Sequence, residues 1–185
     1  MATFGREDVG ETPVDLAPNS IRGTVYTCLE TGILNSMDIR CNPKSAGDAK
    51  CLLYLHSDLS LKATSTARTF TGLEAEDWYT FTFAGEALVN AAYVLCIFPG
   101  ISMNILRFNN AEVDGYHYQD VAYPNAPDPL VPTHANHQMS IHADYTPSAG
   151  VSKKRMLMGV GLMAKTPKFQ PRKVVPFKCP LPLFK

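Results

Sequence analysis

The stretch Asp77–Phe83, with the sequence DWYTFTF, decides the fold of this 185-residue chain. Its residues alternate with a period of two, so that Tyr79, Phe81 and Phe83 share one face. The opposite face carries two threonines and Trp78, which is the only tryptophan of the chain. Aromatic and β-branched residues are typical of a pleated, partly buried strand. The stretch therefore predicts a β-strand with one face in the core.

Runs of similar character recur along the chain, and turn residues separate them. Strands are predicted at residues 22–30, 33–41, 51–56, 62–70, 78–83, 91–98, 102–108 and 138–146. The run 51–56 is apolar on both faces, which indicates a central strand covered on both sides. No segment keeps a helical period over eleven or more residues. Short strands separated by turns predict an all-β, antiparallel β-sandwich.

Composition and length favour one folded domain with two extensions. Hydrophobic residues make up 45% of the chain and charged residues 18%, as in globular proteins. We expect a sandwich domain at 21–147, an N-terminal arm at 1–20 and a basic, proline-rich C-terminal arm at 148–185. No apolar run is long enough to span a bilayer, so no membrane is expected as a partner. Residues 1–8 lack the features of a secretion signal, so we expect synthesis in a cytoplasm without export by that route.

The formal net charge of zero hides a strong asymmetry. Residues 1–149 hold 17 acidic and 8 basic side chains, which leaves a charge of −9, whereas residues 150–185 hold nine basic side chains and no acidic one. A basic segment attached to an acidic domain is expected to seek a negative surface. That surface is either nucleic acid or an acidic protein such as this domain.

The C-terminal arm combines basic and large apolar residues with five prolines between 167 and 182, which exclude a helix and favour an extended chain. An extended apolar segment needs a surface to lie on, so we expect it to add to a neighbouring sheet edge. The residues expected to make this contact are Lys153, Lys154, Arg155, Leu157, Val160, Leu162, Phe169, Arg172, Lys173 and Phe177. A disordered tail and nucleic-acid binding are the alternatives, and we do not expect nucleic acid because arginine and aromatic residues are sparse.

Residues 114–137 form a long segment rich in tyrosine, histidine and proline, and such segments often carry function. Tyrosine rings stack on sugars and on protein surfaces alike. Tyr116, His117, Tyr118 and Tyr123 are therefore the candidate ligand-binding residues, with a glycan as the candidate ligand. The alternative is that these tyrosines fix the loop to the sandwich.

Catalytic and metal-binding motifs are missing from the sequence. It contains no nucleophile elbow, zincin helix or phosphate-binding loop, so we expect no catalytic residues, no enzyme activity and no cofactor. His134, His137 and His142, with His117 nearby, are candidate metal ligands, but His134 and His137 lie in an irregular predicted loop, where their spacing gives them no common face. Asp114, Asp120 and Asp128 lack the spacing of a calcium loop. The prediction is that no metal is bound.

The five cysteines show no CxxC spacing, which argues against a zinc site and against a full disulfide framework. Cys41 and Cys51 flank a predicted turn and could face each other across a hairpin as a disulfide. Free, small core residues are the alternative.

The order of the core runs gives the chain a resemblance. The runs are Gly32–Leu34, Ser36–Ile39, Ala49–Tyr54, Asp77–Phe81, Ala91–Leu95 and Ser140–Tyr145. Together they resemble jelly-roll β-sandwich modules akin to the galactose-binding and carbohydrate-binding domains of prokaryotic surface proteins and of phage fibre or decoration proteins. The resemblance covers about residues 20–147 and concerns core positions, so it implies a fold more than a function.

The function expected from these features is that of a non-enzymatic structural protein of a phage or virus particle, in a decoration, capsid-stabilising or fibre role. Its expected partners are copies of itself or other particle proteins, and its expected location is the virion, after synthesis in the host cytoplasm. The alternative is a carbohydrate-binding module that uses the segment Tyr116–Tyr123.

Overall fold

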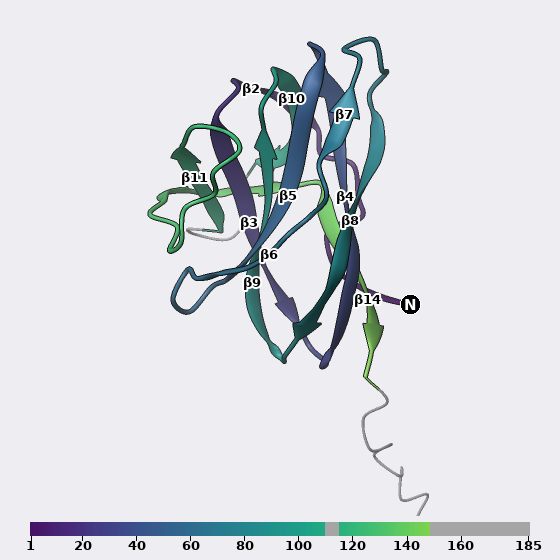
Figure 1. Ribbon diagram of the computed structural model, residues 1–185, viewed down its shortest axis with the longest axis vertical. Coiled ribbons are helices and arrows are strands. Elements are labelled where there is room, and N and C mark those ends of the chain that lie inside the picture. Colours follow the sequence, from purple (N-terminus) through teal and green to yellow (C-terminus); the bar gives the residue numbers. More distant parts are fainter. Residues whose placement is uncertain (110–114, 149–185) are drawn as a thin grey trace, which may run out of the picture. The chain divides into compact units, whose positions relative to one another are not determined.

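The computed structural model describes residues 1–109 and 115–148, and these residues form fourteen β-strands (Figure 1). The strands are β1 (Ala2–Gly5), β2 (Thr12–Leu16), β3 (Ser20–Cys28), β4 (Gly32–Pro43), β5 (Gly47–Leu55), β6 (Leu61–Thr64), β7 (Arg68–Phe70), β8 (Asp77–Leu88), β9 (Ala91–Pro99), β10 (Met103–Asn109), β11 (Tyr116–Asp120), β12 (Thr133–Ala135), β13 (His137–Met139) and β14 (Ile141–Pro147). Within these two ranges the chain has no helix that could cross a lipid bilayer.

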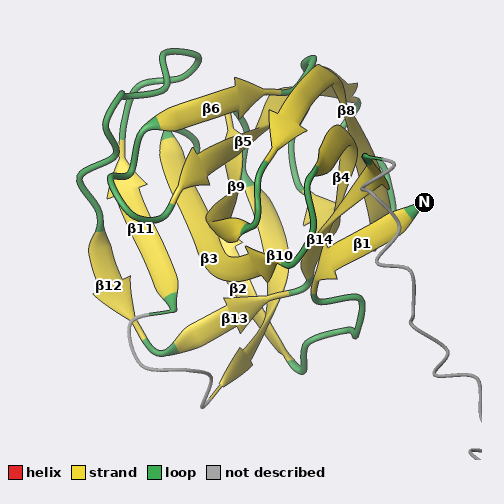
Figure 2. Ribbon diagram, turned by 90° about the horizontal axis from the view of Figure 1, so that it is seen from below, coloured by secondary structure: helices red, strands yellow, loops and turns green. Residues whose placement is uncertain are grey.

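The strands form two antiparallel sheets that pack face to face (Figure 2). The first sheet has the order β1-β14-β4-β10-β13, with β8 added to β4 and β2 added to β10. The second sheet has the order β12-β11-β3-β9-β5-β6, with β7 added to β5. One core cluster draws its buried side chains from both sheets. The predicted all-β sandwich is confirmed.

Four strand pairs in the two sheets are nested in the sequence. The strand β1 pairs with β14, β3 with β9, β4 with β8, and β5 with β6. The outermost pair brings Ala2 opposite Tyr145, and the innermost pair brings Leu52 opposite Thr64. Further pairs, β14 with β4 and β9 with β5, join the nested pairs into sheets. Residues far apart in the sequence are therefore neighbours throughout the sandwich.

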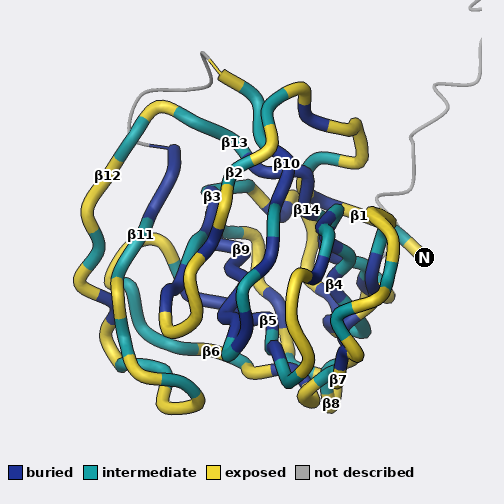
Figure 3. Tube along the Cα trace, turned by 90° about the horizontal axis from the view of Figure 1, so that it is seen from above, coloured by how far each residue is buried: buried dark blue, intermediate teal, exposed yellow. Residues whose placement is uncertain are grey.

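The strand β8 takes the orientation that its alternation predicts. Tyr79 and Phe81 are buried between the sheets, whereas Thr80 and Thr82 on the other face are exposed. Phe81 lies opposite Met37 of β4, and the ring of Tyr79 meets that of Phe70 edge-on at a centroid distance of 5.2 Å. Figure 3 shows the buried stretches of the neighbouring strands in dark blue. This aromatic strand thus anchors the first sheet to the core.

A second apolar cluster lies on the outer face of the second sheet. It consists of Ile21, Leu52, Tyr54, Val94, Cys96, Phe98 and Leu130. The loop 121–132 covers it: Tyr54 donates a hydrogen bond to the carbonyl of Pro127 at 2.9 Å, and Tyr123 meets the ring of Phe98 edge-on at 5.2 Å. This second cover explains why β5 is apolar on both faces, as the sequence predicted.

Residues 1–20 were predicted to form an arm outside the sandwich, but two of their segments are strands of the sandwich. The strand β1 pairs with β14, and β2 pairs with β10, so both belong to the first sheet. Gly5, Gly10 and Pro13 interrupt the alternation of this segment and conceal its strands. Pro13 is tolerated because β2 lies at an edge of the sheet, where a missing amide donor costs no ladder hydrogen bond on the open side.

Two other predicted segments differ from the structure. The single strand predicted at 62–70 is divided into β6 and β7, which pair with different parts of β5. The segment 114–137, predicted as one long loop, contains β11 and β12, and β13 begins at its end. Residues 110–114 and 149–185 lie outside the described residues, so most of the predicted C-terminal arm is not described.

The cysteines of the described residues are free and buried. Cys41 belongs to β4 of the first sheet and Cys51 to β5 of the second, so they do not face each other across a hairpin. The disulfide considered between them is therefore absent from the structure. Burial raises the pKa of the Cys41 thiol to about 12, and a protonated thiol is a poor nucleophile.

Glu74 stabilises the turn before β8 and gives a testable pH dependence. Its carboxylate accepts hydrogen bonds from the amides of Thr71 at 2.7 Å and Gly72 at 2.9 Å. These bonds, chiefly the one from Thr71, lower the pKa of Glu74 from 4.5 to about 2. A lowered folded-state pKa adds stability that is present above the unfolded-state value and is lost as the pH falls toward 2. We expect Glu74→Gln to unfold more easily than the wild type near neutral pH.

The difference between the two proteins should shrink as the pH falls from about 4.5 to about 2, because the wild-type carboxylate becomes protonated. Urea unfolding at several pH values measures this difference in stability. Glu11→Gln serves as the control, because Glu11 is exposed and lies just before β2. A difference that stays constant over this pH range would contradict the assignment.

Candidate functional site

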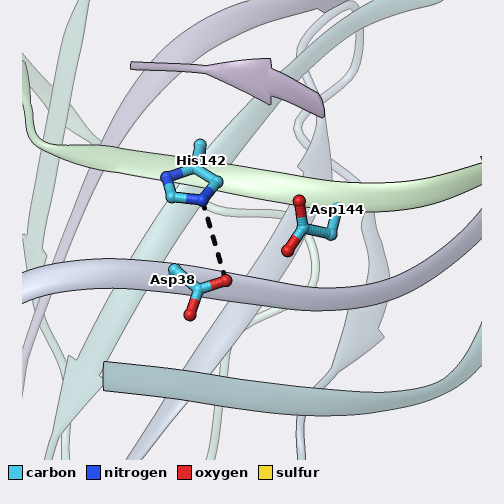
Figure 4. Close-up of side chains that lie close together, drawn as sticks. All are labelled: Asp38, His142 and Asp144. Carbon is cyan, nitrogen blue, oxygen red and sulfur yellow. Dashed lines mark ion pairs between the residues drawn. The ribbon is translucent and has the colours of Figure 1, made fainter. Parts of the chain in front are cut away.

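Three polar side chains meet on the outer face of the first sheet. Asp38 lies on β4, and His142 and Asp144 lie on β14. The neighbours of these residues along the strands, Met37, Ile39 and Ala143, are buried in the core. The register places His142 directly opposite Asp38 and Asp144 opposite Ser36. Figure 4 shows the imidazole and both carboxylates turned toward one another. Strand pairing therefore builds a cluster from residues about a hundred positions apart, which we call the Asp-His-Asp cluster.

The potential ligand atoms of this cluster are close together. The Nε2 atom of His142 lies 3.7 Å from Oδ2 of Asp38, and one donor atom from each of the three residues lies within 4.8 Å of the others. The side chains of His142 and Asp38 are 16% and 14% exposed. The cluster is thus shielded from most of the solvent but remains accessible from outside.

Neighbouring side chains fix the two carboxylates. The hydroxyl of Thr80, on β8, donates a short hydrogen bond to Oδ1 of Asp38. The hydroxyl of Ser36 donates to Oδ2 of Asp144 at 3.3 Å. On the other side, the ring of Trp78 meets that of His142 at a centroid distance of 5.1 Å and an interplanar angle of 62°. Side chains from two strands, β4 and β8, therefore hold the cluster in place.

The electrostatics of the cluster follow from its partial burial. Burial raises the pKa of the Asp144 carboxyl, the nearby His142 opposes this rise, and the negative charge of Asp38 adds to it. Nδ1 of His142 has no hydrogen-bond partner among the described residues. Two carboxylates this close repel each other unless a proton or a cation lies between them. The arrangement suits cation binding or proton sharing.

Two hollows of the described surface lie away from the cluster. One is lined by residues that include Phe4, Tyr26 and Tyr145, and another by residues that include Leu16 and Lys44. Neither contains a member of the Asp-His-Asp cluster. The cluster lies on the outer face of the sheet with little exposed surface, so a small ion fits it better than an organic substrate does.

The structure does not bring the predicted glycan-binding residues to one surface. Tyr116 is 4% exposed within the core between the sheets, and His117, on the opposite face of β11, is 1% exposed. Tyr118 is partly buried against the same core, and Tyr123 belongs to the cover of the second apolar cluster. The predicted glycan contact is therefore wrong for Tyr116 and His117, whose rings are inaccessible. The alternative, in which tyrosines fix this segment to the sandwich, matches the positions of all three.

Of the candidate histidine ligands, the fold brings His117 and His134 together but keeps His142 apart from them. The ring of His134 meets that of His117 at 4.6 Å on the second sheet, and His137 lies beside Tyr116 at 5.7 Å. His142 lies on the first sheet, where its neighbours are Asp38 and Asp144. The period of two in the predicted strand 138–146 puts His142 and Asp144 on one face, but the sequence does not identify Asp38 as their partner, because the pairing of β4 with β14 is long-range.

The aspartates considered for calcium have other partners. Asp120 pairs with Arg22 at 3.3 Å, and Asp128 accepts a hydrogen bond from the amide of Leu61 at 2.9 Å. Asp114 lies outside the described residues, as do the residues of the predicted C-terminal contact, Lys153 to Phe177. Their roles stay predictions.

Neither a known family model nor a curated protein sequence matches this chain. Inference about its function therefore starts from the sandwich, the charge distribution and the Asp-His-Asp cluster.

Proposed function

We propose that this chain is a non-enzymatic structural protein that assembles into a phage or virus particle, as a decoration, capsid-stabilising or fibre component. The proposal includes a jelly-roll topology for the sandwich. Supporting it, the nested pairs are those of one long hairpin rolled into two sheets, with β1-β14-β4-β8 in one and β3-β9-β5-β6 in the other. Jelly rolls of eight strands are common in viral capsid proteins and also in lectins.

The observation that carries the assembly role is the charge contrast along the chain. The segment 150–185 has nine basic and no acidic side chains, and the remainder carries a charge of −9. Opposite charges steer copies of one protein toward each other and orient them. The apolar residues of the same segment, such as Leu157, Leu162 and Phe169, would then be buried against a neighbouring copy or another particle protein.

The edges of the first sheet offer places for such an added strand. Among residues 1–109 and 115–148, β1 pairs with β14 alone and β2 with β10 alone, so no described strand lies on the other side of either. An open edge presents unpaired amides and carbonyls that accept a strand from another chain. Backbone hydrogen bonds at such an edge would supply affinity, and the basic side chains would supply orientation.

Deleting residues 150–185 tests the assembly role. Sedimentation velocity and electron microscopy of the full chain should show oligomers or particles that weaken as salt is raised, because salt screens exposed charges. The truncated chain should be a monomer whose circular dichroism spectrum still shows the β-sheet of a folded sandwich. A full-length triple variant, Lys153→Gln with Lys154→Gln and Arg155→Gln, separates charge from length and should assemble more weakly. Assembly by the truncated chain equal to that of the full chain, or a full chain that stays monomeric, would refute the proposal.

A further inference from the structure

The Asp-His-Asp cluster has the donor set of a metal site. It offers one imidazole nitrogen and two carboxylate groups from two neighbouring strands, with the donor atoms within 4.8 Å of one another. Zn²⁺ binds imidazole at about 2.0 Å and carboxylate oxygen at about 2.1 Å, so tetrahedral ligands lie about 3.3 Å apart. The 3.7 Å between Nε2 of His142 and Oδ2 of Asp38 has to contract by a few tenths of an ångström, and the other spacings, which are at most 4.8 Å, by up to about 1.5 Å.

No arginine or lysine of the described residues forms an ion pair with Asp38 or Asp144, and the ion-pair partner of Asp38 is His142. Arg40, the next outward-facing residue on β4, pairs instead with Glu76 at 3.4 Å and Asp77 at 3.1 Å. With a neutral imidazole, Asp38 and Asp144 leave two negative charges on a partly buried patch. A divalent cation would compensate both charges, whereas a protonated His142 would compensate only one.

The supporting shell is already formed. Thr80 and Ser36 donate hydrogen bonds to the carboxylates of Asp38 and Asp144. Hydrogen bonds of this kind orient metal ligands and limit the rearrangement that binding requires. Trp78 covers one side of the imidazole, while the partial exposure of His142 and Asp38 leaves an entry path for the ion.

From this geometry we propose that Asp38, His142 and Asp144 bind one divalent transition-metal ion, with Zn²⁺ and Mn²⁺ as the best-fitting ions. Imidazole favours a transition metal over Mg²⁺ or Ca²⁺, which take oxygen ligands, and two carboxylates favour Zn²⁺ or Mn²⁺ over softer ions. Three protein ligands leave at least one coordination position for water. The ion links β4 to β14, the last strand of the sandwich, and so holds the first sheet together. This inference is independent of the assembly role.

The test uses the tag-free full chain, stripped of metal with a chelator and titrated with Zn²⁺, Mn²⁺, Ca²⁺ and Mg²⁺ by calorimetry. We expect one Zn²⁺ or Mn²⁺ per chain and much weaker binding of the other two ions. At a free ion concentration about 100 times the dissociation constant, the melting temperature should rise by about 5 to 10 °C. Asp38→Asn, Asp144→Asn and His142→Gln should each lower the affinity at least about tenfold.

A matched control removes a histidine from the other sheet. His134→Gln changes an exposed imidazole near His117 and should leave the affinity unchanged. Mn²⁺ also locates the site without mutation, because it broadens the nuclear magnetic resonance signals of nearby residues and has little affinity for the buried thiols. Broadening should centre on Asp38 and on His142–Asp144.

Three results would overturn the assignment. They are the absence of saturable Zn²⁺ or Mn²⁺ binding, cluster variants that bind the ion as tightly as the wild type does, and Mn²⁺ broadening centred on other residues. If an aspartate variant fails to fold, His142→Gln and the Mn²⁺ map of the wild-type chain still decide the question.

Discussion

Phe81→Ala is expected to lower the free energy of unfolding by about 3 to 5 kcal/mol, the usual cost of removing a buried phenylalanine ring. Phe81 is 1% exposed between the two sheets, faces Met37 on the adjacent strand and lies 6.4 Å from the ring of Phe70. The alanine leaves a cavity that rigid strands on both sides close only in part. Denaturant unfolding followed by tryptophan fluorescence measures the loss.

Phe83→Ala is the matched control for this substitution. Phe83 lies two residues further along the same face of β8 but is only partly buried, so its loss should cost clearly less than that of Phe81. Equal costs at the two positions would mean that the core does not centre on Phe81 as the structure indicates.

Phe98→Ala should be comparably destabilising, by about 3 to 5 kcal/mol, although its side chain lies outside the space between the sheets. Phe98 is fully buried in the second apolar cluster, beneath the loop 121–132 and against the ring of Tyr123. Losing the ring removes the surface on which the loop packs. We therefore expect faster cleavage of this loop in limited proteolysis, together with the lower unfolding free energy.

Tyr123→Phe serves as the control for Phe98→Ala because it keeps the aromatic ring and its packing. Its effect should stay within about 0.5 kcal/mol, and the loop should resist protease as in the wild type. A Phe98→Ala protein within about 1 kcal/mol of the wild type would show that the loop does not depend on this cluster.

Most of the sandwich could be predicted from local patterns. Alternation identified β8, and the apolar run at β5 revealed a strand covered on both faces. Patterns failed where strands are short or interrupted: β12 and β13 have three residues each, and Pro13 lies within β2. Three residues are too few to establish a period, and edge strands tolerate residues that central strands exclude.

The sequence indicates which way the side chains of the candidate site face but not that they lie close together. A period of two puts His142 and Asp144 on one face of a strand, and it puts Asp38 on the face opposite Met37 and Ile39. What brings them together is the pairing of β4 with β14, which local sequence does not specify. The tyrosine-rich segment was predicted to present its aromatic rings at a surface. Tyr123 instead packs against the apolar outer face of the second sheet, which local sequence does not reveal.

The nesting of the strand pairs has a consequence for synthesis on the ribosome. The inner hairpin of β5 and β6 can form as soon as it emerges, whereas β1 must wait for β14, some 140 residues later. At ordinary translation rates the delay is on the order of ten seconds. During this delay β14, which pairs with both β1 and β4, has not yet been made. The edges of β1 and β4 that β14 will cover stay unpaired in the nascent chain, and such edges promote aggregation. The described part of the first sheet can be completed only when translation has passed residue 147.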